Sequence, residues 1–147
     1  MNADNPLCTP ALEVPFDRVR PEHVEPAVDA LIAQAQAEID RIAAQDGAAP
    51  TYASTLGALE RATERLEYAM SIAGHLESVR TTPELREAYN AAQPKVSAFY
   101  AAIPMNEGLY RALRAFAETA EAKALPPERA RYLKKTLDDF RRNGALL

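Results

Sequence analysis

The sequence has few of the residues that build disulfide, metal or phosphate sites. Its 147 residues include one cysteine, Cys8, so no disulfide can form within the chain and a reducing compartment is expected. The only histidines, His23 and His75, cannot by themselves form a usual structural zinc site. The five glycines are isolated from one another, which excludes a glycine-rich phosphate loop. Composition thus excludes several kinds of site and identifies no function.

Net charge and hydropathy exclude further classes of protein. The formal net charge of −4 argues against a nucleic-acid partner. No apolar stretch approaches the roughly 20 residues of a membrane-spanning helix, so no membrane partner is expected. Residues 1–12 carry Asp4 and Pro6, without a basic flank or an apolar run, and do not resemble a signal peptide. We therefore expect a soluble, cytoplasmic protein.

What the sequence does contain is alanine, about a fifth of all residues, with no β-branched runs, and both features favour helix. We predict an all-α fold of about five helices in an irregular antiparallel bundle. Prolines at positions 6, 10 and 15 exclude a regular helix over residues 1–20, which are expected to form an extended arm. The arm should dock on the core through its apolar residues Leu7, Leu12, Val14 and Phe16. Residues 21–147 are expected to form one helical domain.

Apolar residues spaced three or four apart predict the first two helices. The first spans residues 21–45, with Pro26 expected to bend or delay its start and Gly47 predicted as its left-handed cap. The second spans residues 54–79, followed by Thr82 and Pro83 as the cap and first residue of the next helix. The residues predicted to face the core are Val24, Val28, Leu31, Ala35, Ile39, Ile42, Leu56, Leu59, Thr63, Leu66, Met70, Ala73, Leu76 and Val79.

The same spacing predicts three more helices. One covers residues 83–103 and should be kinked by Pro94, and another covers residues 106–122. The last starts at the pair Pro126–Pro127 and closes at Asn143–Gly144. Their predicted core residues are Leu85, Ala88, Tyr89, Ala92, Val96, Phe99, Ile103, Leu109, Leu113, Phe116, Ala120, Ala130, Leu133, Leu137 and Phe140.

No residue pattern indicates catalysis or metal binding. A zinc peptidase helix needs two histidines one turn apart, but Ala27 stands one turn after His23, and His75 has no such partner either. We interpret His23 as a polar residue at a helix start and His75 as a half-buried residue on a helix face. Cys8 has no histidine or helix start nearby to activate it, and we interpret it as a small apolar residue. The sequence thus assigns no catalytic, cofactor-binding or metal-binding residue.

Charge is distributed unevenly along the chain. Residues 1–124 carry 11 basic and 18 acidic side chains, a net −7, whereas residues 125–147 carry 6 basic and 3 acidic, a net +3. A phosphate-binding patch is one interpretation of the basic set, and a solvated helix end or a contact with an acidic domain is the favoured one. The pair Asp138–Asp139 is interpreted as solvated charge. The basic set comprises Arg129, Arg131, Lys134, Lys135, Arg141 and Arg142.

Aromatic residues gather in the second half of the chain, at helical spacings. This is typical of a core between helices, although tyrosines such as Tyr100 and Tyr110 could instead line a cleft. The set comprises Tyr89, Phe99, Tyr100, Tyr110, Phe116, Tyr132 and Phe140.

Several short segments occur in an order that resembles the amino-terminal region of a known family. They are Asn5-Pro6-Leu7, Arg20-Pro21-Glu22-His23-Val24-Glu25-Pro26-Ala27, His75-Leu76, Pro83-Glu84-Leu85-Arg86-Glu87-Ala88-Tyr89, Glu107-Gly108-Leu109-Tyr110 and Leu137-Asp138-Asp139-Phe140. The family is the oligopeptidase A and thimet oligopeptidase family of zinc metallopeptidases, and the bacterial oligopeptidase A branch is more similar. The resemblance covers essentially the whole chain.

The resemblance implies a supporting role. In that family the zinc helix, with its His-Glu-x-x-His motif, lies downstream of the matched region, so zinc is expected in a catalytic domain that these residues do not include. The amino-terminal helices form part of one wall of a channel that admits short peptides. The chain would then supply wall and scaffold, and its partners would be the catalytic domain of the same polypeptide and, in the whole enzyme, short peptides.

Two other hypotheses compete with this one. A stand-alone helical interaction module without enzymatic activity is the alternative, and a helical scaffold unrelated to peptidases is a third that does not explain the ordered segments. Residues 144–147, Gly-Ala-Leu-Leu, follow a helix cap with an apolar tail, which suits a chain that continues. A domain separated from a larger enzyme should expose apolar surface, so homodimers or aggregates are expected at high concentration.

Overall fold

A computed structural model of the chain describes residues 4–45 and 49–144, and these contain helices and irregular segments but no strand. The elements are α1 (Pro21–Ala43), α2 (Leu56–Val79), α3 (Pro83–Ala102), the 3₁₀-helix η1 (Ile103–Met105), α4 (Glu107–Ala117), α5 (Ala120–Lys123) and α6 (Pro127–Arg142). The predicted all-α fold is confirmed. The predicted cap at Gly47 lies outside the described residues.

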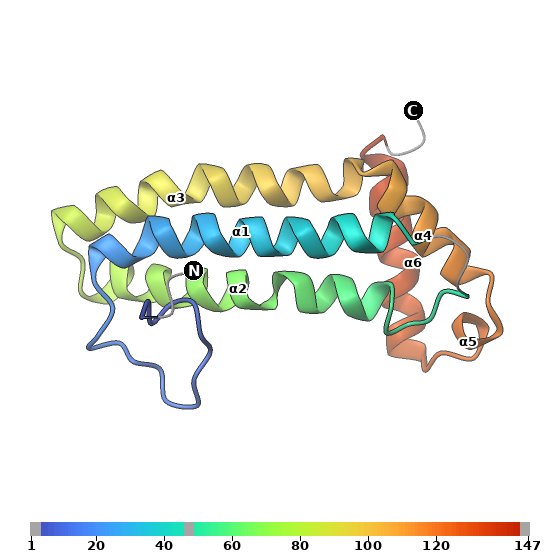
Figure 1. Cartoon of the computed structure of the whole chain (residues 1–147), viewed down its shortest axis with the longest axis horizontal. Coiled ribbons are helices and arrows are strands. Elements are labelled where there is room, and N and C mark those ends of the chain that lie inside the picture. Colours follow the sequence, from blue (N-terminus) through green and yellow to red (C-terminus); the bar gives the residue numbers. More distant parts are fainter. Residues whose placement is uncertain (1–3, 46–48, 145–147) are drawn as a thin grey trace. The chain divides into compact units, whose positions relative to one another are not determined.

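The chain divides into two compact units, and the three longest helices pass through both. Unit 1 comprises residues 1–35 and 63–99, and unit 2 comprises residues 36–62 and 100–147. In unit 1 the helical segments 21–35, 63–79 and 83–99 lie side by side, and successive segments run in opposite directions (Figure 1). That residues 21–147 form a single domain stays a prediction.

The core of unit 1 uses the predicted faces of its three helical segments. Its buried side chains are Val24, Ala27, Val28, Leu31, Ala35, Leu66, Ala69, Ile72, Ala73, Leu76, Leu85, Ala92 and Phe99. Lys95 Nζ on α3 lies 3.3 Å from Glu25 Oε1 and 3.0 Å from Asp29 Oδ1 on α1, which bridges the exposed edges of these helices. The prediction for Val79 is wrong: it is 57% exposed, because it ends α2 on the side that carries His75.

Most helix starts follow the predictions, whereas the kink predicted at Pro94 and the bend predicted at Pro26 stay predictions. The Thr82 hydroxyl accepts a hydrogen bond from Leu85 N at 3.1 Å, so Thr82 caps α3 as predicted. Helix α1 contains Pro26 near its start, and α3 continues through Pro94. At the end of α6, Gly144 has a φ of 92°, a left-handed conformation that glycine adopts without strain.

The amino-terminal arm is fixed to unit 1 at its first described residues. Asn5 Nδ2 donates to His23 O at 2.8 Å, Asn5 Oδ1 accepts from Leu7 N, and the Leu7 side chain is 1% exposed. Further along, Ala11 N donates to the Tyr68 hydroxyl at 3.2 Å. The prediction that Leu12 and Phe16 dock on the core is wrong, because the Leu12 side chain points fully into solvent and Phe16 is 38% exposed.

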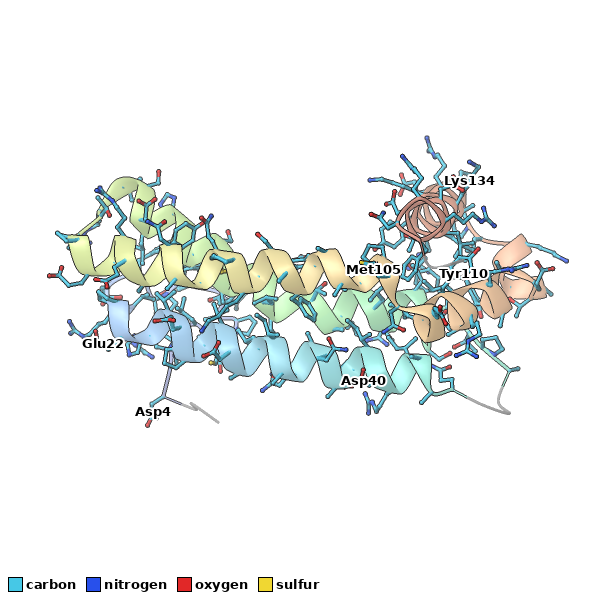
Figure 2. The ribbon with its side chains drawn as sticks, turned by 90° about the horizontal axis from the view of Figure 1, so that it is seen from above. Asp4, Glu22, Asp40, Met105, Tyr110 and Lys134 are labelled. Carbon is cyan, nitrogen blue, oxygen red and sulfur yellow. The ribbon has the colours of Figure 1, made fainter. Side chains whose placement is uncertain are left out.

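In unit 2 the helix α6 packs against α4 and η1, and Figure 2 views α6 along its axis with α4 lying across it. The buried side chains of this unit are Ile39, Ile42, Leu56, Leu59, Leu109, Tyr110, Leu113, Phe116, Ala122, Leu133, Leu137 and Phe140. They include most of the predicted core residues of α4 and α6, spaced by three or four as amphipathic helices require.

The helix predicted over residues 106–122 is interrupted. Helix α4 ends at Ala117, and Thr119 starts α5 with its side chain accepting from Ala122 N at 3.1 Å. The break turns Ala120 to solvent and buries Ala122 in its place, so the prediction for Ala120 is wrong. Ala130 is also exposed, because the buried stripe of α6 begins only at Leu133.

Candidate functional surface

The two histidines occupy different structural positions, and neither is a candidate metal ligand. His23 Nδ1 accepts a hydrogen bond from Arg20 N at 3.0 Å, which satisfies a backbone donor at the start of α1 and confirms the predicted helix-start role. His75 is exposed on α2, with its ring centroid 5.3 Å from that of Phe16. The predicted half-burial of His75 is therefore wrong, because its neighbour is the thin amino-terminal arm.

The described residues hold no group of three or more histidine, cysteine, aspartate or glutamate side chains able to bind a metal ion. The acidic pair that the sequence suggests, Asp138–Asp139, is paired with cations of the same helix. The residues present in the described part of the chain therefore do not fit the zinc that the family resemblance implies for the whole enzyme.

Cys8 lies in a turn of the arm, where its amide donates to Asn5 O at 3.0 Å. Partial burial raises the pKa of its thiol, because the thiolate would lose hydration there. A nucleophilic cysteine needs the opposite shift. The geometry thus favours an unreactive thiol, in line with the interpretation from sequence.

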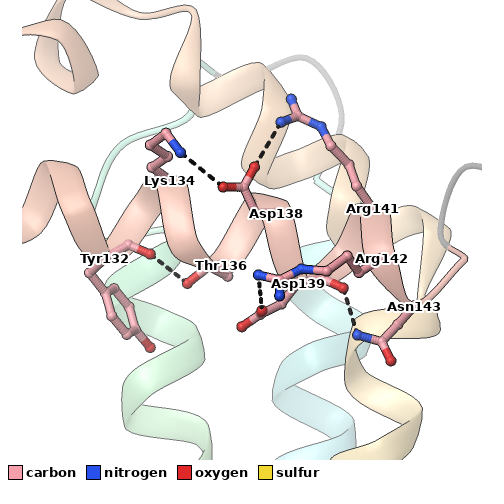
Figure 3. A network of polar contacts seen from close by, with 8 residues as sticks. All are labelled: Tyr132, Lys134, Thr136, Asp138, Asp139, Arg141, Arg142 and Asn143. Atoms are coloured by element: carbon pink, nitrogen blue, oxygen red, sulfur yellow. Dashed lines mark hydrogen bonds and ion pairs between the residues drawn. The ribbon is translucent and has the colours of Figure 1, made fainter.

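The outer side of α6 carries a network of ion pairs within the helix (Figure 3). Asp138 receives both Lys134 Nζ and Arg141 Nη1 at 3.1 Å, and Arg142 Nη2 lies 3.2 Å from Asp139 Oδ1. The hydrogen bond from Lys134 is the main cause that lowers the pKa of Asp138. The acidic pair is thus solvated charge held by cations three or four residues away.

The basic set of α6 is partly neutralised by this network. Arg129 also has a partner, since its guanidinium lies 4.5 Å from the centroid of the Tyr52 ring. Among the described residues, Arg131 and Lys135 lie in no ion pair, and both are exposed. Arg141 and Arg142 stand in the last turn, where cations complement the helix dipole. This arrangement favours the interpretation as a solvated helix end.

Tyr110 resolves one of the alternatives left open for the aromatic residues. It is 3% exposed, stacks on Phe140 with ring centroids 5.8 Å apart, and accepts a hydrogen bond from Arg141 Nε at 3.1 Å. Its ring and its hydroxyl are both used in packing α4 against α6. Tyr110 therefore belongs to the core of unit 2. Tyr100, the other tyrosine considered for a cleft, is half-buried.

Tyr52 organises a cluster in unit 2 that sequence reasoning missed. Its ring contacts both the Arg129 guanidinium of α6 and the Phe116 ring of α4, whose centroid is 6.1 Å away. Its amide points to the Glu121 carboxylate, with nitrogen–oxygen distances of 3.2 and 3.3 Å. Tyr52 O accepts from Gly57 N at 2.8 Å at the start of α2. The cluster fixes the segment before α2 to three other elements.

The sequence also matches a family model. The model is the N-terminal domain of neurolysin and thimet oligopeptidase, and it matches residues 28–147. The chain belongs to the neurolysin/thimet oligopeptidase family. The part of the family that the chain matches is the N-terminal domain.

Curated members of this family are much longer than the chain. Oligopeptidase A of Escherichia coli is 34% identical over 140 residues, which are 95% of this chain and 20% of the relative. The probable cytosolic oligopeptidase A of Arabidopsis thaliana is 28% identical over 99% of this chain and 20% of its own length. The organellar oligopeptidase A of the same plant is 28% identical over 93% of this chain and 17% of its own length. The chain therefore spans about a fifth of the length of these relatives.

Within the described residues, no helix has both the length and the apolar character that crossing a membrane would require.

Proposed function

We propose that the chain is the non-catalytic helical domain of an oligopeptidase A-like metallopeptidase that cleaves short peptides, and that it forms part of the substrate-channel wall and its scaffold. The observation that carries this proposal is the family match over residues 28–147 in a chain that spans a fifth of its relatives. In this proposal the zinc ion and the catalytic groups belong to the part of the polypeptide that these residues do not include. Its proposed location is the cytoplasm.

The chemistry of the side chains supports a scaffold role. His23 holds the start of α1, Asp138 and Asp139 hold cations along α6, and burial raises the pKa of Cys8. Groups that act in catalysis need pKa values and partners suited to proton transfer or nucleophilic attack. These groups instead have partners that stabilise helix ends and helix surfaces.

The test has two arms. In the first, the purified chain is examined for helical circular dichroism and for cleavage of short fluorogenic peptides with and without a chelator. We expect a helical spectrum and no chelator-sensitive cleavage. Chelator-sensitive turnover by the pure chain, after exclusion of contaminating peptidase, would contradict the proposal.

In the second arm, the chain replaces the matching 140 residues of E. coli oligopeptidase A to give a chimera. We expect the chimera to retain peptide cleavage, and the same enzyme without those residues to lose it, because the wall and its support would be absent. A chimera that folds but cleaves no peptide would refute the scaffold role. It would then favour the alternative of a stand-alone interaction module.

A further inference from the structure

We propose that the exposed side chains of Leu12, Phe16 and Val79 form a docking patch on unit 1 for the remaining part of the peptidase polypeptide. This inference rests on the proposed function and adds to it the surface that meets the catalytic part. The three side chains are 107%, 38% and 57% exposed.

Phe16 and Val79 flank the same residue of α2. The Phe16 ring contacts the His75 ring, with a centroid separation of 5.3 Å. Val79 follows His75 by four residues, so it lies one turn further along the same face of the helix. The two apolar side chains and the imidazole ring thus form a continuous surface at the end of α2.

Leu12 extends this surface toward the start of α2. The neighbouring Ala11 amide donates to the Tyr68 hydroxyl at 3.2 Å, which holds this part of the arm beside Tyr68. Tyr68 precedes His75 by seven residues, or about two helical turns, and therefore lies on the same face of α2. The arm thus contacts one face of α2 at Tyr68 and again at His75, and Leu12 lies between these two contacts in the sequence with its side chain in solvent.

The arm that carries Leu12 and Phe16 is anchored to unit 1 before these residues and leads into α1 after them. Before them, the buried Leu7 and the hydrogen bond from Asn5 to His23 O fix the arm to unit 1. Beside Phe16, its amide donates to Val14 O at 2.9 Å, and Arg18 N donates to Pro15 O at 3.0 Å. Leu12, Phe16 and Val79 together present more apolar surface to water than a single exposed residue would, and exposed apolar patches mark interaction sites.

The size of the patch and the length of the relatives point to an occupant within the same polypeptide. A stable complex of separate proteins buries roughly 800 Å² on each partner, which three partly exposed side chains cannot supply. Two parts of one chain meet at a high effective concentration and need a smaller contact. The relatives are about five times as long as this chain, so a large part of such a polypeptide is available to cover the patch.

The test compares two variants, Leu12→Ser and Val79→Ser, in the isolated chain and in the chimera with E. coli oligopeptidase A. Both side chains face solvent in the isolated chain, so its melting temperature should stay within experimental error. In the chimera we expect each variant to lower the melting temperature by several degrees and to accelerate limited proteolysis about tenfold. Glu13→Ser is the matched control, since it changes an exposed residue of the same arm without removing apolar surface.

Each other result overturns the inference. Variants that leave the chimera unchanged would show that nothing docks there, and equal losses in chimera and isolated chain would show that the side chains stabilise unit 1 itself. A dimer of the isolated chain that persists on dilution and that both variants dissociate would identify a second copy as the occupant, whereas weak association confined to high concentration would not. The unsubstituted chimera is measured first, and its failure to fold and cleave peptides would count against the proposed function as well.

Discussion

At the residue scale, the backbone of α2 at Gly74 packs closely against the Tyr89 side chain of α3. A Cβ atom at position 74 would lie 3.0 Å from the Tyr89 hydroxyl oxygen and 3.5 Å or more from the ring carbons. Only the hydroxyl is therefore too close for an ordinary contact. The same hydroxyl accepts a hydrogen bond from Gln93 Nε2 at 3.1 Å on the exposed side of α3.

This geometry predicts that the effect of Gly74→Ala depends on residue 89. Alanine in a helix interior is about 1 kcal/mol more favourable than glycine. In the Tyr89→Phe background the gain should approach this value, whereas with Tyr89 present the shifted hydroxyl should cancel most of it. Urea unfolding of the four proteins of this double-mutant cycle measures the difference. Equal effects of Gly74→Ala in both backgrounds would contradict the predicted contact.

A second prediction concerns the thiol of Cys8. Because burial raises its pKa, the thiolate fraction at pH 8 should be smaller in the folded chain than in the unfolded chain. Alkylation by iodoacetamide should therefore be several-fold slower in buffer than in urea. Leu7→Ala should raise the rate in buffer by weakening the anchor of the arm, and Leu12→Ser, at an exposed position, should not. A folded-state rate equal to that in urea would refute the prediction.

The Tyr52 cluster shows why part of a site escapes sequence reasoning. Tyr52 contacts Phe116, Glu121 and Arg129, which lie between 64 and 77 positions further along the chain. No spacing rule relates residues in separate elements, and a single tyrosine between helices is an ordinary turn residue in the sequence. His23, by contrast, was predictable, because its partner Arg20 is three residues away and the interaction is local.

At the scale of the element, short helices depend on their caps. Asn106 Oδ1 accepts from Leu109 N at 2.9 Å and begins α4, which has only 11 residues. We predict that Asn106→Ala lowers the free energy of unfolding by about 1 kcal/mol, because the Leu109 amide loses its acceptor. Asn106→Asp keeps an acceptor at the positive end of the helix, so it should change the free energy of unfolding by only about a few tenths of a kcal/mol. Chemical denaturation compares the two, and equal losses would contradict the cap.

Helix α6 allows a comparison of ion pairs with apolar packing. Asp138→Asn should change the free energy of unfolding far less than a substitution in the apolar core, because its pairs with Lys134 and Arg141 are exposed. Leu137→Ala, at a side chain that is 8% exposed, should cost about 2–5 kcal/mol.

The lowered pKa of Asp138 means that its contribution to stability is present at neutral pH and is lost as the pH falls through that pKa. Urea unfolding at neutral pH and below pH 3 measures both effects, and a larger loss from Asp138→Asn than from Leu137→Ala would refute the comparison.

Burial was more predictable in helix interiors than at helix ends. All six residues predicted to face the core along α1 are buried, because a repeating apolar face determines which side of a long helix packs. Val79, Ala120 and Ala130 are exposed, and each stands within four residues of a helix end. There the neighbouring element decides burial. The break before α5 had a local signal in Thr119, a good capping residue, which the continuous alanine-rich pattern obscured.

At the scale of the whole molecule, two kinds of surface could make the chain associate, and salt distinguishes them. Residues 125–147 carry a net +3 and residues 1–124 a net −7, so ionic contacts between copies are one route. The exposed apolar side chains of unit 1 are the other, and they underlie the self-association expected from the sequence at high concentration.

We predict that the apolar route dominates. Ions at about 0.5 M screen exposed charges beyond a few ångströms, so ionic association should disappear there, whereas apolar association should persist or strengthen. Sedimentation velocity at several protein concentrations, with and without added NaCl, measures this. Raising the pH from the isoelectric point, about 5.3, to 8 should weaken association as the negative charge grows. If salt alone dissociates the copies, the contact is ionic and is assigned to α6. If association is then lost in Arg131→Ser but kept in Leu12→Ser, the contact lies on the exposed cations of that helix.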